Sequence, residues 1–348
     1  MLKRTPFHPL IALICTLILP AAAWAANPYQ SRNTHFGVSG GNVNDISKAF
    51  CCGGTLGSLL TNGTTRFILS NNHIFARTDQ AAAGEDISQP GLIDNGCRIP
   101  PTIVADYTRA IRLGNNVDCA IAQLRTGTMD STGFIEGIGT ISSSTSAPAV
   151  GMAVIKSGRT TGTTTGNIAS VNTSVKVQYQ QGCNSGKKFT VSYTNQVLIN
   201  SSSFSAGGDS GSLIVSNDGA FHPVALLFAG SSSTTIANPI NEVLGKLGGG
   251  LSFVGSNSSG GPNSGTTTQT AQVPKAEVFH AAKALERRRF NLMSRGSVLG
   301  VGVGAADTAG KAAIIVYVDK GASKRPQLPT QISGVPVKVH MTDAFVAF

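Results

Sequence analysis

Charged side chains are scarce in this sequence. They make up 13% of its 348 residues, whereas Gly alone occurs 41 times and the remaining polar residues are mostly Ser and Thr. A disordered chain is rich in charge and poor in apolar residues, and a helical bundle is rich in Glu and Lys, so the composition disfavours both. It favours a β-rich, turn-rich globular protein. A chain of this length is expected to form roughly two or three folded units.

Long apolar runs are absent after the N-terminal segment. That segment has Lys3 and Arg4, then an apolar stretch over residues 10–19 and a small-x-small site, Ala-Trp-Ala, at residues 23–25. This is the pattern of a secretory signal peptide over residues 1–25. The apolar run is short for a membrane anchor. The mature protein, starting near Ala26, is therefore expected to be soluble, not transmembrane, and secreted or periplasmic.

Cysteines are also few. Removing the signal peptide takes away Cys15 and leaves five: Cys51, Cys52, Cys97, Cys119 and Cys183. Export permits disulfides, but an odd number leaves at least one thiol unpaired in a monomer, and the sequence does not determine the pairing. These cysteines lack the paired spacing and nearby histidines of a zinc site. We predict structural cysteines, no metal and no cofactor.

The positive charge is unevenly spread. Residues 272–348 carry 11 basic and 5 acidic side chains, whereas residues 26–271 carry 14 and 12. An anionic surface is one partner for the basic segment, and a solvated helix face is the alternative. No aromatic residues interleave with the charges, so a specific nucleic-acid partner is not expected.

Short apolar runs bounded by Gly, Asn, Ser and Thr extend from residue 53 to about residue 247, which is typical of β-barrels. We predict strands at residues 55–60, 66–69, 120–124, 152–155, 174–179, 196–199, 212–215 and 224–228, and a closing helix at residues 239–247. A Ser/Ala/Pro-rich stretch, residues 142–149, separates two sets of strands. The predicted divisions are a leader or pro-segment at residues 26–50, a first β-barrel at 51–148 and a second at 149–254.

A linker and a further module are expected after these strands. Residues 255–271 are nearly all Gly, Ser, Asn and Thr and cannot bury a core. Beyond them we predict a helix over residues 274–293, in which Arg287, Arg288 and Arg289 cannot all face the core, and strands at residues 298–303, 312–318, 335–339 and 345–348. Residues 272–348 should form a small, separate α+β domain.

The sequence Gly-Asp-Ser-Gly-Ser at residues 208–212 is the main chemical signal. A nucleophilic serine needs a tight turn that projects its hydroxyl and an adjacent base that removes its proton. Among the histidines, only His73 directly follows an apolar strand and leads into an apolar segment. Asp118 heads the apolar run 120–124 and is the best carboxylate to orient a histidine, ahead of Asp106 and Asp130.

These three blocks resemble the catalytic blocks of trypsin-like serine peptidases, in the chain order His, Asp, Ser. That order differs from those of α/β-hydrolases and subtilisins. Residues 53–58, 156–162 and 228–230 resemble a secreted bacterial branch of the same family. The resemblance covers residues 53–247 and implies an all-β unit of two six-stranded antiparallel β-barrels, with the triad in the cleft between them.

The resemblance also implies a mechanism. Ser210 would attack a peptide carbonyl, His73 would act as general base and Asp118 would orient it, with an oxyanion hole formed by the N–H groups of Gly208 and Ser210. In many animal members Asp209 pairs with a newly cut N-terminus, and a cysteine follows the histidine. Here Ile74 follows His73, so that disulfide is absent.

The specificity pocket is less clearly marked. The position six before Ser210, which is acidic in enzymes that cut after Lys or Arg, is Phe204. We expect Phe204, Leu227, Phe228, Ala229 and Gly230 to bind substrate, the last four as a strand that pairs with the substrate backbone. A small or uncharged residue before the cleaved bond is expected. The rival hypotheses are a catalytically silent two-barrel binding protein and surface anchoring through residues 272–348.

Overall fold

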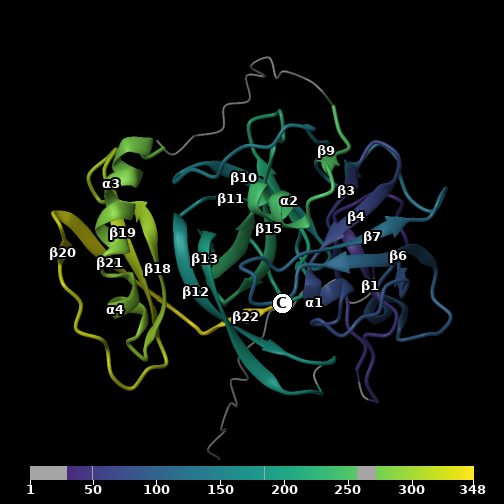
Figure 1. The fold of residues 1–348 in the computed structure, drawn as a ribbon, viewed down its shortest axis with the longest axis horizontal. Helices are drawn as coiled ribbons and strands as arrows, with labels where there is room; N and C mark the ends of the chain where they lie inside the picture. The colour runs from purple at the N-terminus through teal and green to yellow at the C-terminus, as the bar shows by residue number, and fades with distance from the viewer. Residues whose placement is uncertain (1–29, 49, 184, 257–271) are drawn as a thin grey trace, which may run out of the picture.

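The structure is a computed structural model that describes residues 30–48, 50–183, 185–256 and 272–348. The expected signal peptide and residues 257–271 of the expected linker lie outside this part. Strands are the main regular structure of the described chain, and they form one sheet of eight strands, one of twelve and a small pair formed by β8 (Phe134–Ile135) and β9 (Gly139–Thr140). Figure 1 shows the first sheet in purple and blue beside the teal and green strands of the second.

The first sheet curls back on itself. Its order is β17-β3-β4-β7-β6-β5-β1-β2. Its strands are β1 (Val38–Asn42), β2 (Gly54–Leu56), β3 (Ser58–Thr61), β4 (Arg66–Ser70), β5 (Asp86–Ser88), β6 (Ile103–Ala110), β7 (Ala120–Leu124) and β17 (Ser252–Phe253). Because only Gly57 separates β2 at one end from β3 near the other, the sheet must close toward a barrel. A side chain could not fit at Gly57, where a Cβ would lie 2.0 Å from the Gly211 carbonyl oxygen.

Part of the expected leader or pro-segment, residues 26–50, lies within the first sheet. Val38–Asn42 is strand β1, which pairs with both β2 and β5, and the Phe36 side chain is fully buried. The segment was missed because two of its five strand residues are glycines, so no alternating apolar pattern marks it. Its neighbours in the sheet, rather than its own residues, make it a strand.

The second sheet begins with seven strands that also return on themselves, in the order β11-β10-β14-β15-β16-β13-β12. These are β10 (Ala153–Gly158), β11 (Gly162–Asn167), β12 (Ser170–Gln180), β13 (Lys188–Asn200), β14 (Leu213–Ser216), β15 (Pro223–Gly230) and β16 (Thr234–Pro239), followed by helix α2 (Ile240–Leu247). Two residues, 168 and 169, join the strands at opposite ends. The predicted closing helix is confirmed.

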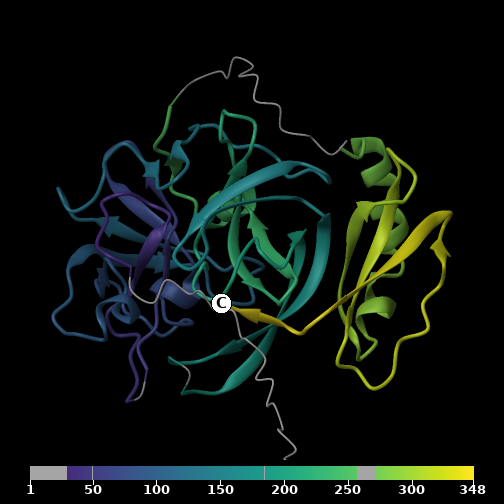
Figure 2. The same ribbon diagram turned by 180° about the vertical axis from the view of Figure 1, so that it is seen from behind.

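The C-terminal residues extend this second sheet rather than standing apart. They form α3 (Lys275–Glu286), α4 (Arg289–Met293), β18 (Val298–Ala305), β19 (Ala312–Asp319), β20 (Gln331–Ile332), β21 (Val335–Thr342) and β22 (Phe345–Ala347). Because β18 pairs with β12, the sheet continues into this region, which lies on the side of the second sheet away from the first (Figures 1 and 2). The sheets contain eight and twelve strands rather than the expected six each, because β1 and β17 join the first sheet and β18 to β22 join the seven strands of the second.

The three consecutive arginines of this region differ in exposure, as expected because neighbouring residues on a helix face different directions. Arg287 and Arg288 are exposed, whereas Arg289 is half-buried and donates to the Asn172 carbonyl oxygen at 3.1 Å and to Ser174 Oγ at 2.6 Å. Arg289 therefore attaches the module to β12. Within the described ranges, no helix is long and apolar enough to cross a membrane.

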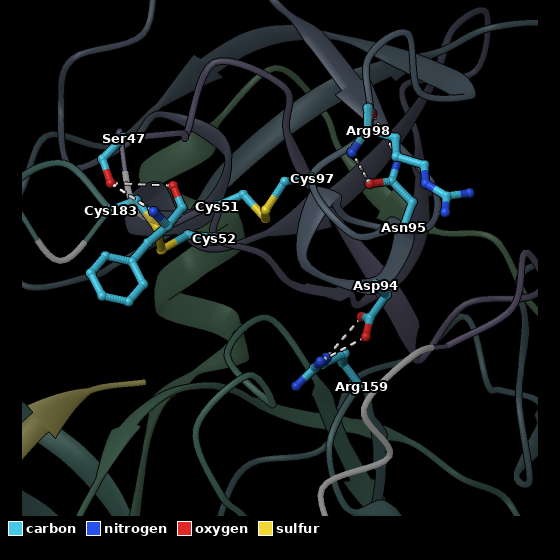
Figure 3. Close-up of a disulfide and its surroundings, with 10 residues drawn as sticks. Ser47, Cys51, Cys52, Asp94, Asn95, Cys97, Arg98, Arg159 and Cys183 are labelled. Atoms are coloured by element: carbon cyan, nitrogen blue, oxygen red, sulfur yellow. Dashed lines mark hydrogen bonds and ion pairs between the residues drawn. A yellow bond between two sulfur atoms is a disulfide. The ribbon is translucent and has the colours of Figure 1, made fainter.

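Two disulfides connect distant segments. Cys51 pairs with Cys97 and Cys52 with Cys183 (Figure 3). Cys119 is a free, buried thiol whose pKa is raised by burial and by Asp118. The second bridge joins the first half of the chain to the β12–β13 hairpin of the second half. Disulfides form and persist in oxidising compartments, so both bridges agree with folding outside the cytoplasm.

Candidate active site

His73 and Asp118 meet at one edge of the first sheet. His73 lies on the one-turn helix α1 (Asn72–Phe75) that follows β4, and Asp118 lies two residues before β7. Since Ser70 of β4 pairs with Ala120 of β7, the two residues are brought to the same end of neighbouring strands. His73 Nδ1 donates to Asp118 Oδ2 at 2.6 Å, and the His73 backbone N–H donates to Oδ1 at 3.2 Å.

Asp118 is fully buried and held from several sides. Its backbone N–H donates to Asn238 Oδ1 at 2.9 Å, and Asn71 Nδ2 donates to its carbonyl oxygen at 2.7 Å. The Tyr179 hydroxyl donates to Asp118 Oδ2 at 2.9 Å. Tyr179 comes from β12 of the second sheet and was not predicted as a site residue. No motif marks it, because the contact joins residues 61 positions apart.

The electrostatics of the site raise the pKa of His73. Burial on its own would lower the pKa of His73, but the Asp118 carboxylate, the Phe348 backbone oxygen and the Asp45 carboxylate together outweigh burial and raise it. Asp45 lines the same cavity of about 300 Å³ as His73. Its own burial raises the pKa of Asp45 to about 6, although Arg77 and His73 pull it down.

Ser210 lies in a tight loop just before β14. Gly208 and Gly211 on either side have φ of +98° and +94°, a conformation that favours glycine. The Ser210 carbonyl oxygen accepts from the Thr55 N–H at 2.8 Å, which holds the loop against β2 of the first sheet. Ser210 Oγ donates to the Phe228 carbonyl oxygen at 3.2 Å. The loop thus lies at the junction of the two sheets.

Phe348, rather than Ser210, contacts the second ring nitrogen of His73. The Phe348 backbone oxygen lies 3.1 Å from His73 Nε2. In the part of the chain that the structure describes, no hydrogen bond joins Ser210 to His73. In the same part, the backbone N–H groups of Gly208 and Ser210 donate to no protein group. Both N–H groups are therefore free to donate to a further oxygen.

Asp209 is satisfied by internal groups. It accepts hydrogen bonds from the backbone N–H groups of Thr160, Thr161 and Ala206 and from the Thr161 hydroxyl, and the fully buried Lys156 Nζ lies 3.4 Å from its Oδ2. Lys156 also donates to the Gly162 carbonyl oxygen at 2.9 Å and to Thr161 Oγ1. The ammonium group that faces Asp209 is thus a lysine of the segment 156–162 and not a chain terminus.

The expected substrate-binding residues fall into two groups. Ala229 and Gly230 pair with β22, and Phe348 lies against Gly230. Leu227 and Phe228 are fully buried in the cores on either side of β15. Phe204 is also fully buried, packed beside Gly166, and its carbonyl oxygen accepts from the Thr164 hydroxyl at 2.7 Å. Its side chain belongs to the core of the second sheet.

The comparisons with known proteins are limited to structure. No family model matches the chain, and no curated protein matches it in sequence. In structure it matches bacterial serine proteases of the chymotrypsin fold over about 63% of its length, and the C-terminal region lies outside the match.

Three of the matches have TM-scores between 0.43 and 0.45. A glutamic-acid-specific serine protease is 23% identical, with a TM-score of 0.45, over 63% of this chain and 98% of its own. Protease A of Thermobifida fusca is 18% identical, with a TM-score of 0.44, over 64% and 99%. Nocardiopsis protease is 18% identical, with a TM-score of 0.43, over 63% and 98%. Because these values are low, the geometry of His73, Asp118 and Ser210 carries the functional proposal.

Proposed function

We propose that this protein is a secreted or periplasmic serine endopeptidase, with Ser210 as nucleophile, His73 as general base and Asp118 as the residue that orients the base. The observation that carries this proposal is the contact of His73 Nδ1 with a buried, multiply bonded Asp118, which leaves Nε2 facing the cleft. A carboxylate in that position fixes the tautomer of the imidazole and stabilises the imidazolium. The disulfides support the extracytoplasmic location.

The groups of the site supply each step of acyl transfer. Ser210 Oγ attacks the peptide carbonyl while His73 Nε2 takes the hydroxyl proton, and the unbonded N–H groups of Gly208 and Ser210 stabilise the oxyanion. His73 then gives the proton to the leaving amine, which departs and leaves an ester on Ser210. Water, deprotonated by His73, hydrolyses that ester and restores the free serine.

Labelling with a fluorophosphonate tests the nucleophile. We expect the processed protein to be labelled on Ser210, and the Ser210→Ala chain to show neither labelling nor cleavage of a peptide library. Ser203→Ala is the matched control, because Ser203 is an exposed serine in the same segment. If neither the folded wild type nor a folded Phe348→Ala chain is labelled, the silent two-barrel binding protein is favoured instead.

A further inference from the structure

Strand β22 leaves the C-terminal module and enters the region between the two sheets. It pairs antiparallel with β15, with Ala347 opposite Ala229 and Val346 opposite Gly230. It also runs parallel to β12, with Phe345 opposite Val177. Figures 1 and 2 both show the strand in yellow reaching from the module to the end of the chain, marked C beside α1. A segment of the chain itself therefore occupies the edge of β15 that we assign to substrate.

The direction of the segment is that of the acyl half of a substrate. The chain runs along β15 toward His73 and brings the Phe348 backbone oxygen to 3.1 Å from Nε2. The carbonyl that a serine peptidase attacks belongs to the residue before the cleaved bond. Phe348 thus takes the place of that residue, and Ala347, Val346 and Phe345 take the three places before it.

The side chains of this segment are held to different degrees. The Phe348 ring lies over Gly230, where an added Cβ would come within 2.4 Å of Cζ, so only glycine leaves room for it. Phe345 is 1% exposed and belongs to the core cluster around Tyr179 and Tyr193. Val346 is 40% exposed. The places of Phe348 and Phe345 therefore select the side chain that they bind, whereas the place of Val346 does not.

Phe348 lines two hollows, and one of them carries little charge. Its lining outside residues 343–348 is Thr160, Thr161, Ser202, Ser205, Ala206, Gly207, Ser231 and Ser232, all uncharged, and it also includes Asp343, whereas the other hollow contains Asp45, His73 and Arg159. Because Asp343 already pairs with Lys320 Nζ at 2.9 Å, a charged residue placed in the first groove would lose water without gaining a free counter-ion. Large apolar side chains suit this groove.

Anchors outside the cleft keep the segment in place, and it covers the nucleophile. Thr342 Oγ1 lies 2.6 Å from Ser231 Oγ, and Asp343 accepts from the Ser232 hydroxyl and pairs with Lys320 Nζ at 2.9 Å. With the segment present, Ser210 is 0% exposed and the His73 side chain 9%. An external peptide cannot reach Ser210 until the segment moves away.

We propose that residues 345–348 fill the cleft as an internal substrate-like strand, so that the peptidase prefers a large apolar residue immediately before the cleaved bond and is blocked until the strand leaves. This rests on the proposed function. The substrate class is peptides with Phe or a residue of similar size and polarity at that place and a small residue before it.

The first test compares the full-length wild type with Phe348→Asp and Phe348→Ala. Both substitutions remove the ring from the groove, and the second adds no charge that could disturb folding. We expect fluorophosphonate labelling of Ser210 and cleavage of a Phe-Val-Ala-Phe anilide to rise by about tenfold or more, the factor set by burying one aromatic side chain. Phe290→Asp is the control, because Phe290 is 87% exposed in the same module.

The second test addresses preference, in the Phe348→Ala chain. Anilides that end in Phe should be cleaved in preference to those that end in Asp, Lys or Ala. Gly230→Val should abolish cleavage after Phe while cleavage after Ala continues, and Gly245→Ala, where an added Cβ meets nothing within 4 Å, should change neither. The peptide Phe-Val-Ala-Phe should inhibit, and Phe-Val-Ala-Asp should not.

The outcomes separate the two proposals. Wild type that labels and cleaves as fast as both Phe348 variants would overturn the inference while leaving the peptidase intact. Equal rates for Phe and Asp anilides would overturn the preference. Absence of labelling in all folded variants would overturn the proposed function itself.

Discussion

The Tyr179 hydroxyl donates to Asp118 Oδ2 at 2.9 Å, the same oxygen that His73 Nδ1 contacts at 2.6 Å. The Tyr179 hydroxyl has one proton and donates it to Asp118. The Tyr193 hydroxyl, which lies 2.6 Å away, must therefore donate to Tyr179. Tyr193, Tyr179 and Asp118 thus form a chain of hydrogen bonds that runs from the second sheet to His73 of the first. Tyr179 is a positioning residue, since it acts on the base only through Asp118.

Tyr179→Phe should therefore lower kcat/KM by roughly 10- to 100-fold, the range set by one hydrogen bond to a charged group. Without that donor, more negative charge faces His73, so the pKa of His73 should rise and the acid limb of the pH profile should move to higher pH. Steady-state rates against pH, within chains that also carry Phe348→Ala, would measure both effects. Tyr193→Phe removes a hydrogen bond between two uncharged hydroxyl groups, so it should lower kcat/KM by less than Tyr179→Phe does. An unchanged pH profile would leave Tyr179 a packing residue.

Lys156→Met should destabilise the protein strongly. The substitution leaves the buried Asp209 carboxylate without a cation, and loss of one partner of a buried pair typically costs about 3–5 kcal/mol. Denaturant unfolding would measure the free energy of unfolding, with the exposed Lys187→Met as control. Equal losses in the two variants would show that Asp209 is satisfied by its backbone N–H and threonine donors.

Asp45 should make stability depend on pH. Burial raises the pKa of Asp45 from 3.8 to about 6, so between these values the folded protein holds a proton that the unfolded chain has released. Stability from this group is thus present at pH 4 and lost as pH rises through 6, by up to about 3 kcal/mol. Relative to wild type, Asp45→Asn should gain stability from pH 4 to pH 8. The same difference in unfolding free energy between Asp45→Asn and wild type at pH 4 and at pH 8 would contradict this.

The two disulfides should differ in their contribution. Cys52 and Cys183 are 131 residues apart and Cys51 and Cys97 are 46 apart. In the chain-entropy description, the longer loop is worth about 1 kcal/mol more. Replacing each pair by serines in separate double variants and comparing their unfolding free energies would check this. A larger loss from Cys51 and Cys97 would mean that local structure, and not loop entropy, dominates.

Much of the site could be predicted from the sequence because its residues follow or precede strands with strong apolar patterns. Residues 120–124 were predicted as a strand and form β7, and Asp118 before them is the carboxylate that contacts His73. The helix after β16 and the unpaired cysteine were also anticipated. Strand β11 was missed because its residues are Thr, Gly and Asn, with no apolar face to recognise.

By itself the sequence determined the mostly β character, the export signal as a prediction, and the three residues assigned to catalysis, since these depend on local composition, periodicity and motif. Only the tertiary structure decided which distant groups meet. It alone brought Tyr179 to Asp118 and Lys156 to Asp209. It also took residues 345–348, correctly predicted as a strand but assigned to the C-terminal module, and placed them beside β15. A strand's own residues set its conformation, whereas its partner depends on which edge is free when the whole chain has folded.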